Sequence, residues 1–330
     1  VKGREVISGH EIDHLDDEKL YQRVIKERVL ARVSPQHKNR IVQVLKSHGQ
    51  VVAMTGDGIN DAPAIKAADI GIAMGISGTE VSREASSMVL MDDDFSTIVQ
   101  AVYEGRAIYD NIRKFIRYLL GCNIGEVMVM LLASIMALPL PLLPIQILWV
   151  NLVTDGLPAM ALGVEPPEPG IMKRRPRPKN ESIFAHKLAL TIFSRGIYIA
   201  VITIAIFMIA YGWSVSQGQN GLDLARTMAF TTLVMAQLFY VFECRSENYS
   251  PFELGFFKNK FLIFAVCFSV MMQLSVIYLP FLQSVFKTVP LLGWQWLLIL
   301  SLSGIRVIAR LLLYTWQRVF VSNIRYVKME

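Results

Sequence analysis

The residues best suited to chemistry lie in one short stretch, TGDGIND, at residues 55–61. Gly56 and Gly58 permit tight turning and a close approach of the backbone to a ligand. Asp57 and Asp61 place two carboxylates within one loop and the start of a helix. Such hard oxygen ligands suit Mg²⁺, which keeps several waters and takes one or two carboxylates together with phosphate. The whole stretch therefore favours Mg²⁺ and phosphate chemistry, whereas a bare Asp-Gly pair would indicate a simple turn with a helix cap.

The elements that must position this loop alternate between strand and helix, which is typical of a parallel α/β sheet. Apolar runs and amphipathic spacing predict strands at 29–33, 51–54 and 70–75, helices at 18–28 and 36–47, and a helix then a strand at 81–90. The loop follows the second strand, at the carboxyl end where such sheets bind ligands. Lys38, near the start of its helix, can offset phosphate charge.

Composition separates a soluble part from a membrane part. Of the 330 residues, 53% are hydrophobic and 18% are charged, whereas soluble domains carry about 25% charged residues. The shortfall falls in residues 119–317, which hold apolar runs long enough to cross a membrane. We expect six spans, at about 118–138, 143–163, 188–212, 224–243, 260–281 and 294–316.

Basic residues gather in alternate connections between these spans and in the tail. The positive-inside rule places these connections in the cytosol, together with the soluble part. Membrane topology thus explains the net charge of +6, and we expect no nucleic-acid partner. The basic run KRRPRPK at 173–179 keeps a second interpretation, as a patch that binds lipid or nucleic acid.

One long helix is predicted to join the two parts, over Gly105–Leu138. Its first half is charged and amphipathic, its second half is apolar, and no proline breaks it. A helix of this length measures about 50 Å, which exceeds a bilayer core of about 30 Å. We therefore expect a rod that starts in water and ends in lipid.

Polar side chains inside the first two spans form a second candidate site. Those on each span lie three or four residues apart and share a helix face; they are Asn123, Glu126, Asn151, Thr154 and Asp155. Charged groups are costly in a membrane and indicate function by default. All five offer oxygen and none offers sulfur or imidazole, which indicates a hard cation. For an Asn or Thr alone, a hydrogen bond between helices is the alternative.

The backbone after these residues should also contribute to the site. Gly156 and Pro158 follow Asp155 directly and should weaken the helix, which frees carbonyl groups beside a cavity. Ca²⁺ takes about 6–8 oxygen ligands, a number that the side chains and freed carbonyls can approach.

Other polar residues receive no part in either site. The run Asp92–Asp94 is expected to form a solvated turn and cap, and Glu243 and Glu247 are expected at the surface. Arg310 is expected to reach the membrane interface, whereas the sequence offers no account of Arg306.

Three motifs together resemble the P-type cation-transporting ATPases, and more narrowly the SERCA-type calcium pumps. They are ARVSPQHK at 31–38, MTGDGINDAPAIKAADIGIAMG at 54–75 and NLVTDGLPAMALG at 151–163. The resemblance covers nearly all of the chain. It implies the carboxyl-terminal part of a haloacid dehalogenase-like phosphorylation domain at 1–104, followed at 105–330 by a stalk and an all-α bundle of six membrane helices.

The resemblance also implies a role for each residue in the candidate sites. Asp57 matches the Mg²⁺-ligating aspartate, and Lys38 matches the lysine that contacts the phosphoryl group. Three further residues match the family's hinge loop around the phosphorylation site: Thr55, Asn60 and Asp61. The five oxygen-bearing residues of the spans match calcium ligands. A further ligand, a glutamate in the family, falls on Gln237, which has lost the charge; we therefore expect one strong calcium site near Asp155 and a weak second site or none.

The chain departs from the family in what it lacks. No DKTGT motif is present, so the aspartate that accepts phosphate is missing, as are the nucleotide-binding domain and the first four membrane helices. The expectation is a portion of an ATP-driven, Mg²⁺-dependent Ca²⁺ exporter that needs its amino-terminal portion and is inactive alone. The plasma membrane is expected because the short loop at 213–222 looks bacterial. A Mn²⁺ pump, a membrane-tethered phosphatase and a non-catalytic membrane fragment remain alternatives.

Overall fold

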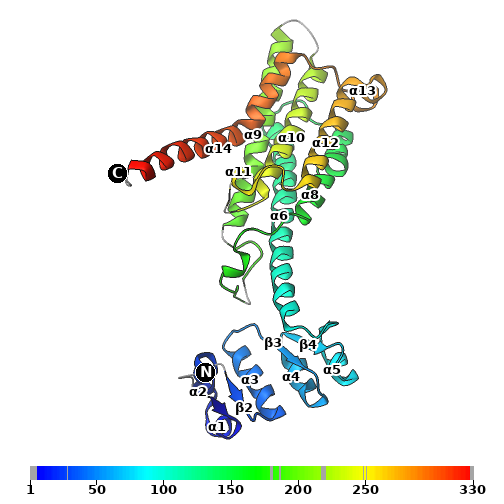
Figure 1. Cartoon of the computed structure of the whole chain (residues 1–330). Coiled ribbons are helices and arrows are strands. Elements are labelled where there is room, and N and C mark those ends of the chain that lie inside the picture. The colour runs from blue at the N-terminus through cyan, green and yellow to red at the C-terminus, as the bar shows by residue number, and fades with distance from the viewer. Residues whose placement is uncertain are drawn as a thin grey trace. The chain divides into compact units, whose positions relative to one another are not determined.

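The computed structural model describes residues 6–27, 29–178, 181–185, 187–216, 221–247, 249 and 251–327, with side chains up to residue 309 and at Leu311. The chain divides into two compact units (Figure 1). Unit 1 holds the chain up to Gly105 together with Met172–Ser182, and unit 2 holds Arg106–Ile171 together with the chain from Ile183 onward.

Unit 1 is an α/β structure, as the sequence predicted. Its strands are all parallel: β1 (Ile7–Ser8) pairs with β2 (Leu30–Ala31), and a second sheet has the order β3 (Ala53–Gly56), β4 (Ile70–Met74), β5 (Met88–Leu90). Helices alternate with the strands: α1 (Gly9–His14), α2 (Asp17–Glu27), α3 (Pro35–Ser47), the 3₁₀ turn η1 (Ile59–Asp61), α4 (Ala62–Ala67) and α5 (Glu80–Ala85). The strand β1 was not predicted, because two residues carry no periodic signal.

Local signals fix where these helices begin. The Ser34 hydroxyl accepts a hydrogen bond from the His37 N–H (3.2 Å) directly before α3, with Pro35 in the first turn, as the Ser-Pro signal predicts. An apolar cluster of fully or nearly fully buried side chains then packs α1, α2 and α3 together with β1; it comprises Ile7, Ile12, Leu20, Ile41 and Val44. Burial of each such side chain stabilises the fold by about 1.5–3 kcal/mol.

Asp93 holds the end of β4 against the turn that follows β5. Its carboxylate accepts hydrogen bonds from the N–H groups of Gly75 (2.6 Å), Ile76 (3.0 Å) and Ser77 (2.8 Å), and from the Ser77 hydroxyl (2.8 Å). These bonds, led by that from the Ile76 N–H, lower the pKa of Asp93 to about 2. The acidic run therefore contains a structural anchor in addition to the turn and cap that the sequence predicts.

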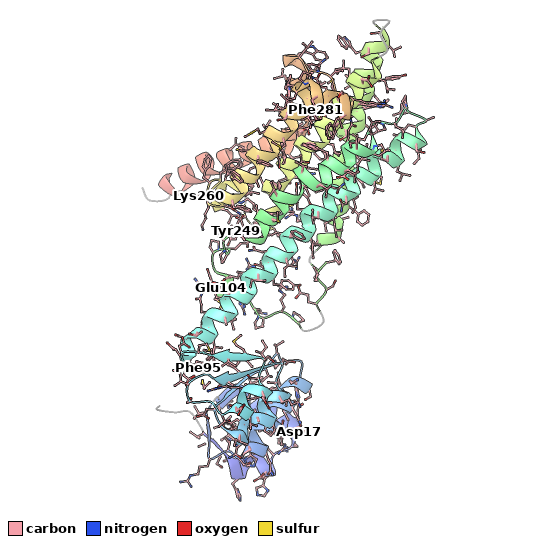
Figure 2. The ribbon with its side chains drawn as sticks, turned by 90° about the vertical axis from the view of Figure 1, so that its right-hand side faces the viewer. Asp17, Phe95, Glu104, Tyr249, Lys260 and Phe281 are labelled. Carbon is pink, nitrogen blue, oxygen red and sulfur yellow. The ribbon has the colours of Figure 1, made fainter. Side chains whose placement is uncertain are left out.

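Unit 2 is helical. Its helices are α6 (Phe95–Ile135, whose first turns belong to unit 1), α7 (Pro144–Trp149), the π-helical turn η2 (Val150–Thr154), α8 (Gly156–Gly163), α9 (Leu188–Ser216), α10 (Leu222–Cys244), α11 (Pro251–Leu254), α12 (Lys260–Tyr278), α13 (Pro280–Phe286) and α14 (Gly293–Val327). The 3₁₀ turn η3 (Ile171–Lys173) follows α8. Figure 2 shows Tyr249 and Lys260 toward one end of this unit and Phe281 at the other, so α12 runs along its length.

Five of these segments are long and apolar enough to cross a membrane: α6, Pro144–Gly163, α9, α10 and α12. The chain is thus a multi-pass membrane protein. The sixth predicted span, at 294–316, stays a prediction, because the described apolar part of α14 is the shorter segment Gly293–Ala309. Most of the predicted rod lies within α6, which runs unbroken for 41 residues but ends at Ile135, three residues before the predicted end.

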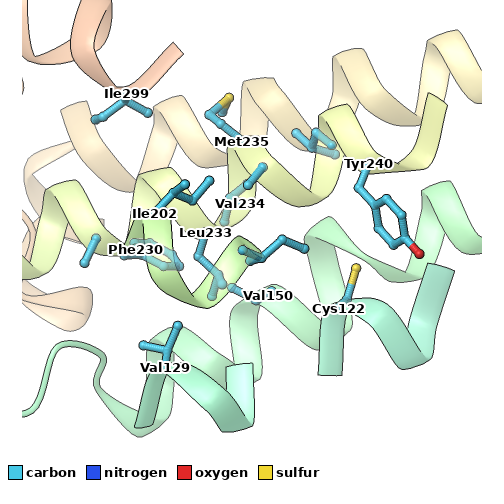
Figure 3. Packing of buried hydrophobic residues seen from close by; sticks show 14 of the residues in the cluster. Cys122, Val129, Val150, Ile202, Phe230, Leu233, Val234, Met235, Tyr240 and Ile299 are labelled. Atoms are coloured by element: carbon cyan, nitrogen blue, oxygen red, sulfur yellow. The ribbon is translucent and has the colours of Figure 1, made fainter. Parts of the chain in front are cut away.

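The helix α10 forms the centre of the bundle. In its apolar window 94% of the residues are buried, against 33–56% in the other spans. Phe230, Leu233 and Val234 are completely buried (Figure 3), and α8, α9, α12 and α14 all contact this helix. Polar residues on α10 therefore face protein rather than lipid.

The predicted surface position of Glu243 is wrong. Its side chain is buried and forms an ion pair with Arg195 of α9. Glu247 is exposed, as expected, and pairs with Arg113 (3.1 Å). A charge at the end of a span can be buried when another helix supplies its partner, and the sequence alone does not reveal that partner.

The structure explains the position of Arg306, which the sequence did not. Its guanidinium lies 5.3 Å from the centre of the Tyr198 ring, a cation–π contact. The side chain of Arg310 lies outside the described residues.

The Asp93 anchor can be tested by hydrogen exchange. Because the folded pKa lies below the ordinary value of 3.8, the anchor stabilises the fold above pH 3.8, and this contribution is lost as the pH falls toward 2. We expect Asp93→Asn to speed amide exchange in a peptide spanning Gly75–Ser77 at neutral pH. Asp94→Asn, which leaves these bonds intact, is the control. Equal exchange in both variants and the wild type would contradict the anchor.

Candidate functional sites

The first candidate site lies at the carboxyl end of β3. Asp61 is buried at the end of η1, and its Oδ1 accepts a 2.6 Å hydrogen bond from the Lys38 ammonium of α3. Lys38 keeps 34% of its side chain exposed. The structure thus brings these two predicted residues together. The positively charged Lys38 ammonium remains partly exposed at the edge of the site.

Asp57 is placed differently from Asp61. Its carbonyl oxygen accepts bonds from the Thr79 N–H (3.0 Å) and the Ser82 hydroxyl (3.4 Å), which tie the loop to the start of α5. Its carboxylate is exposed and makes no hydrogen bond with any described residue. A carboxylate that is held by its backbone and open to water fits Mg²⁺, which retains much of its hydration. Thr55 is partly buried at the end of β3, and Asn60 is exposed.

Only one of the two loop glycines is required by a close contact. A Cβ atom on residue 56 would lie 2.5 Å from the Asp61 Cβ, whereas a Cβ on residue 58 would meet only the Asn60 nitrogen, at 3.9 Å. Gly56 therefore allows Asp61 to turn back toward Lys38.

The second candidate site is centred on Glu126 of α6, which is 5% exposed. Its Oε2 accepts a 2.7 Å bond from the Asn151 amide of η2, and its Oε1 accepts a 3.0 Å bond from the Gln237 amide of α10. Three segments that are distant in sequence therefore meet at one carboxylate. The Oε1 of Gln237 is buried without a hydrogen-bond partner.

Asp155 is the second buried carboxylate, at 1% exposure. Its Oδ1 accepts a 3.0 Å bond from the Tyr118 hydroxyl, and its Oδ2 is buried without a partner. Burial of a charged oxygen is costly unless something compensates it, and unpaired groups of this kind call for an explanation such as an ion. Asp155 therefore keeps one carboxylate oxygen without a hydrogen-bond partner among the described residues.

The other predicted ligands are less closely joined to these acids. Thr154 bonds its own helix through the Val150 carbonyl (3.1 Å), and its carbonyl accepts from the Ser269 hydroxyl (3.2 Å). Asn123 is exposed and makes no hydrogen bond with a described residue. In the described part of the chain, no three His, Cys, Asp or Glu side chains are grouped so that they could hold a metal ion. A cation here would therefore depend on amide, hydroxyl and carbonyl oxygens as well.

The backbone at this site departs from α-helical geometry just before Gly156. The segment Val150–Thr154 is π-helical, and the Asp155 N–H bonds the Val150 carbonyl (2.9 Å). Such π turns are rare and occur frequently at functional sites. The predicted weakening of this span is therefore present, one turn earlier than Gly156 and Pro158 indicate.

Comparison with known proteins identifies the family. Residues 139–315, more than half of the chain, match the family described as cation transporting ATPase, C-terminus, and residues 8–69 match haloacid dehalogenase-like hydrolases. The chain belongs to the cation-transporting ATPases. The resemblance inferred from the three motifs is thus confirmed.

Relatives of the chain include bacterial and human proteins. The calcium-transporting ATPase of Bacillus subtilis is 54% identical over 92% of this chain and 34% of that protein. That of Bacillus cereus, number 1, is 42% identical over 90% of this chain and 35% of that protein. The human calcium-transporting ATPase type 2C member 1 is 43% identical over 92% of this chain and 32% of that protein. The chain spans about a third of the length of these relatives.

Tyr118, whose hydroxyl donates to the Asp155 carboxylate, was not identified from the sequence. Tyr118 lies 37 residues before Asp155 and is fully buried. A buried tyrosine hydroxyl usually has a hydrogen-bond partner. A tyrosine five residues before Asn123 in an apolar span was therefore a usable signal, although its partner could not be read from the sequence.

The close contact at Gly56 gives a stability test. We expect Gly56→Ala to lower the free energy of unfolding by about 1–3 kcal/mol, as overpacking typically does, because the new methyl group displaces Asp61 from Lys38. Gly58→Ala is the matched control and should have little effect. Thermal unfolding of the detergent-purified protein measures both, and equal losses would show that Asp61 does not set the requirement.

Proposed function

We propose that this chain forms part of an ATP-driven pump that exports Ca²⁺ from the cytosol through an aspartyl-phosphate intermediate. The observation that carries the proposal is that two carboxylates within membrane-spanning segments, Glu126 and Asp155, are buried without an arginine or lysine partner among the described residues, and that Asp155 keeps an oxygen without a hydrogen bond. Relatives named as calcium-transporting ATPases support calcium as the cargo. Oxygen ligands alone suit a hard cation.

Unit 1 would supply part of the phosphoryl site. Asp57 would hold Mg²⁺, which neutralises phosphate charge when it is bound. Lys38 would contact the phosphoryl group, and its bond to Asp61 would keep the ammonium oriented until then. Thr55 and Asn60 would line the same loop. We infer that the phosphate-accepting aspartate and the ATP-binding residues come from an amino-terminal portion of the same pump, outside this sequence.

Unit 2 would supply most of the cation site. In the conformation described here, the amide N–H groups of Asn151 and Gln237 satisfy Glu126. Rotation of these amides would present their oxygens instead, and the Asp155 carboxylate would add a further ligand. Thr154 and Asn123 would complete the set after small changes, because neither contacts a carboxylate here. A bacterial plasma membrane is the proposed location, supported by the similarity to the Bacillus pumps.

The two carboxylates give the main test, made in the complete pump that carries this sequence. We expect Glu126→Gln and Asp155→Asn to weaken calcium activation of phosphorylation by ATP by more than the roughly 10- to 100-fold that loss of an outer-shell partner costs at metal sites. Asp223→Asn, an exposed carboxylate at the start of α10, is the control. Unchanged calcium dependence in both variants would remove the cation-site assignment.

The loss of charge at Gln237 predicts the stoichiometry. Because an amide is a weaker calcium ligand than a carboxylate, we expect one tightly bound Ca²⁺ per polypeptide in equilibrium binding. Gln237→Glu should then add a second, weaker ion, with Gln283→Glu on α13 as the matched control. Two tightly bound ions in the wild type would refute the single strong site.

A further inference from the structure

A buried glutamate anchors the end of α8 opposite to the candidate cation site. Glu165 lies two residues beyond α8 and is 4% exposed. Its Oε1 accepts hydrogen bonds from Nε (2.9 Å) and Nη2 (2.8 Å) of Arg245, and its Oε2 accepts one from the amide of Asn259 (2.6 Å). Both carboxylate oxygens are therefore occupied.

The backbone at the same end of α8 is held as firmly. The Asn111 amide of α6 donates to the carbonyls of Glu165 (2.8 Å) and Gly163 (3.2 Å), and the Asn259 amide donates to the Ala161 carbonyl (3.0 Å). The last carbonyls of a helix have no partner within it, so these amides satisfy groups that would otherwise be unpaired.

Glu165 thus joins four helices. Asn111 lies on α6, Arg245 directly follows α10, and Asn259 is the N-cap of α12, where its Oδ1 accepts from the Leu262 N–H (2.9 Å). The candidate cation site uses α6, η2–α8 and α10 as well. The same helices are therefore tied together twice, once through Glu126 and once through Glu165.

Asp155 and Glu165 lie at opposite ends of α8, which is short. The helix has eight residues, about 12 Å at 1.5 Å per residue, with Asp155 as its N-cap and Glu165 just past its other end. Before Asp155 the chain is π-helical, so α8 does not continue a regular α-helix at this end. The anchored end of α8 consequently determines where Asp155 lies.

We propose that Glu165 is a positioning residue for the cation site, which fixes Asp155 by anchoring α8 to α6, α10 and α12. The proposal rests on the proposed function, in which Asp155 binds the transported cation. A buried ion pair is weak as a source of stability, because desolvation offsets the attraction. A fully satisfied buried network does, however, hold its members in one arrangement.

The first arm of the test measures cation affinity in the complete pump. We expect Glu165→Gln to raise the Ca²⁺ concentration for half-maximal phosphorylation by ATP about tenfold, the lower range for loss of an outer partner at metal sites, with the maximal level nearly unchanged. If Glu165→Gln does not fold, Asn259→Ala is the alternative variant, because it removes one bond to Glu165 and keeps the charges of Glu165 and Arg245. Glu243→Gln, which removes the buried ion pair between α9 and α10, should lower yield without shifting the half-maximal concentration.

The second arm does not depend on calcium. Amide exchange across Gly156–Gly163 should become faster in Glu165→Gln and stay at the wild-type rate in Glu243→Gln. Faster exchange with no shift in calcium affinity would overturn the positioning role, and unchanged exchange would overturn the anchor itself. Absence of any calcium-dependent phosphorylation in the wild type would instead refute the proposed function, while the exchange measurement would still decide the anchor.

Discussion

A carboxylate inside a membrane bundle must be compensated, because water is not available to solvate it. Unit 2 meets this constraint in two ways. Glu165 and Glu243 each face an arginine from another helix or its end, Arg245 and Arg195 respectively. Asp155 receives one tyrosine hydroxyl and keeps an unpaired oxygen. The first kind of acid is fully paired within the fold, whereas the second keeps one oxygen that the proposed cation would bind.

The same distinction separates the acids of unit 1, although water can reach them. Asp93 is bound by three backbone N–H groups and one hydroxyl, so its carboxylate has no capacity left for a ligand. Asp57 has a fixed backbone and an open carboxylate. Asp61 lies between these extremes, since it shares its charge with Lys38. Backbone fixation together with an open carboxylate is what an ion ligand needs, and among these three only Asp57 has both.

This distinction explains what could be predicted from the sequence. Strands, helices and spans follow local periodicity, so α3 and β4 agree closely with the predicted ranges, and α6 contains most of the predicted rod but begins ten residues earlier. The motif around Asp57 and the polar residues of the spans also stand out locally. The partners of buried acids do not, because Arg245 is 80 residues from Glu165 and Arg195 is 48 from Glu243. Glu243 was placed at the surface for this reason, and Glu165 received no role.

A transported ion must be released as well as bound, so its ligands must be able to move between arrangements. A helix fixed along its whole length would hold Asp155 in one place, and a helix fixed nowhere would not hold a cation geometry at all. In α8 the two requirements fall on opposite ends. At the Asp155 end the backbone is π-helical over Val150–Thr154, whereas at the other end the network around Glu165 ties the chain to α6, α10 and α12. Because α8 is only about two turns long, a small rotation about its Glu165 end would move Asp155 relative to Glu126, as release of the proposed cation would require.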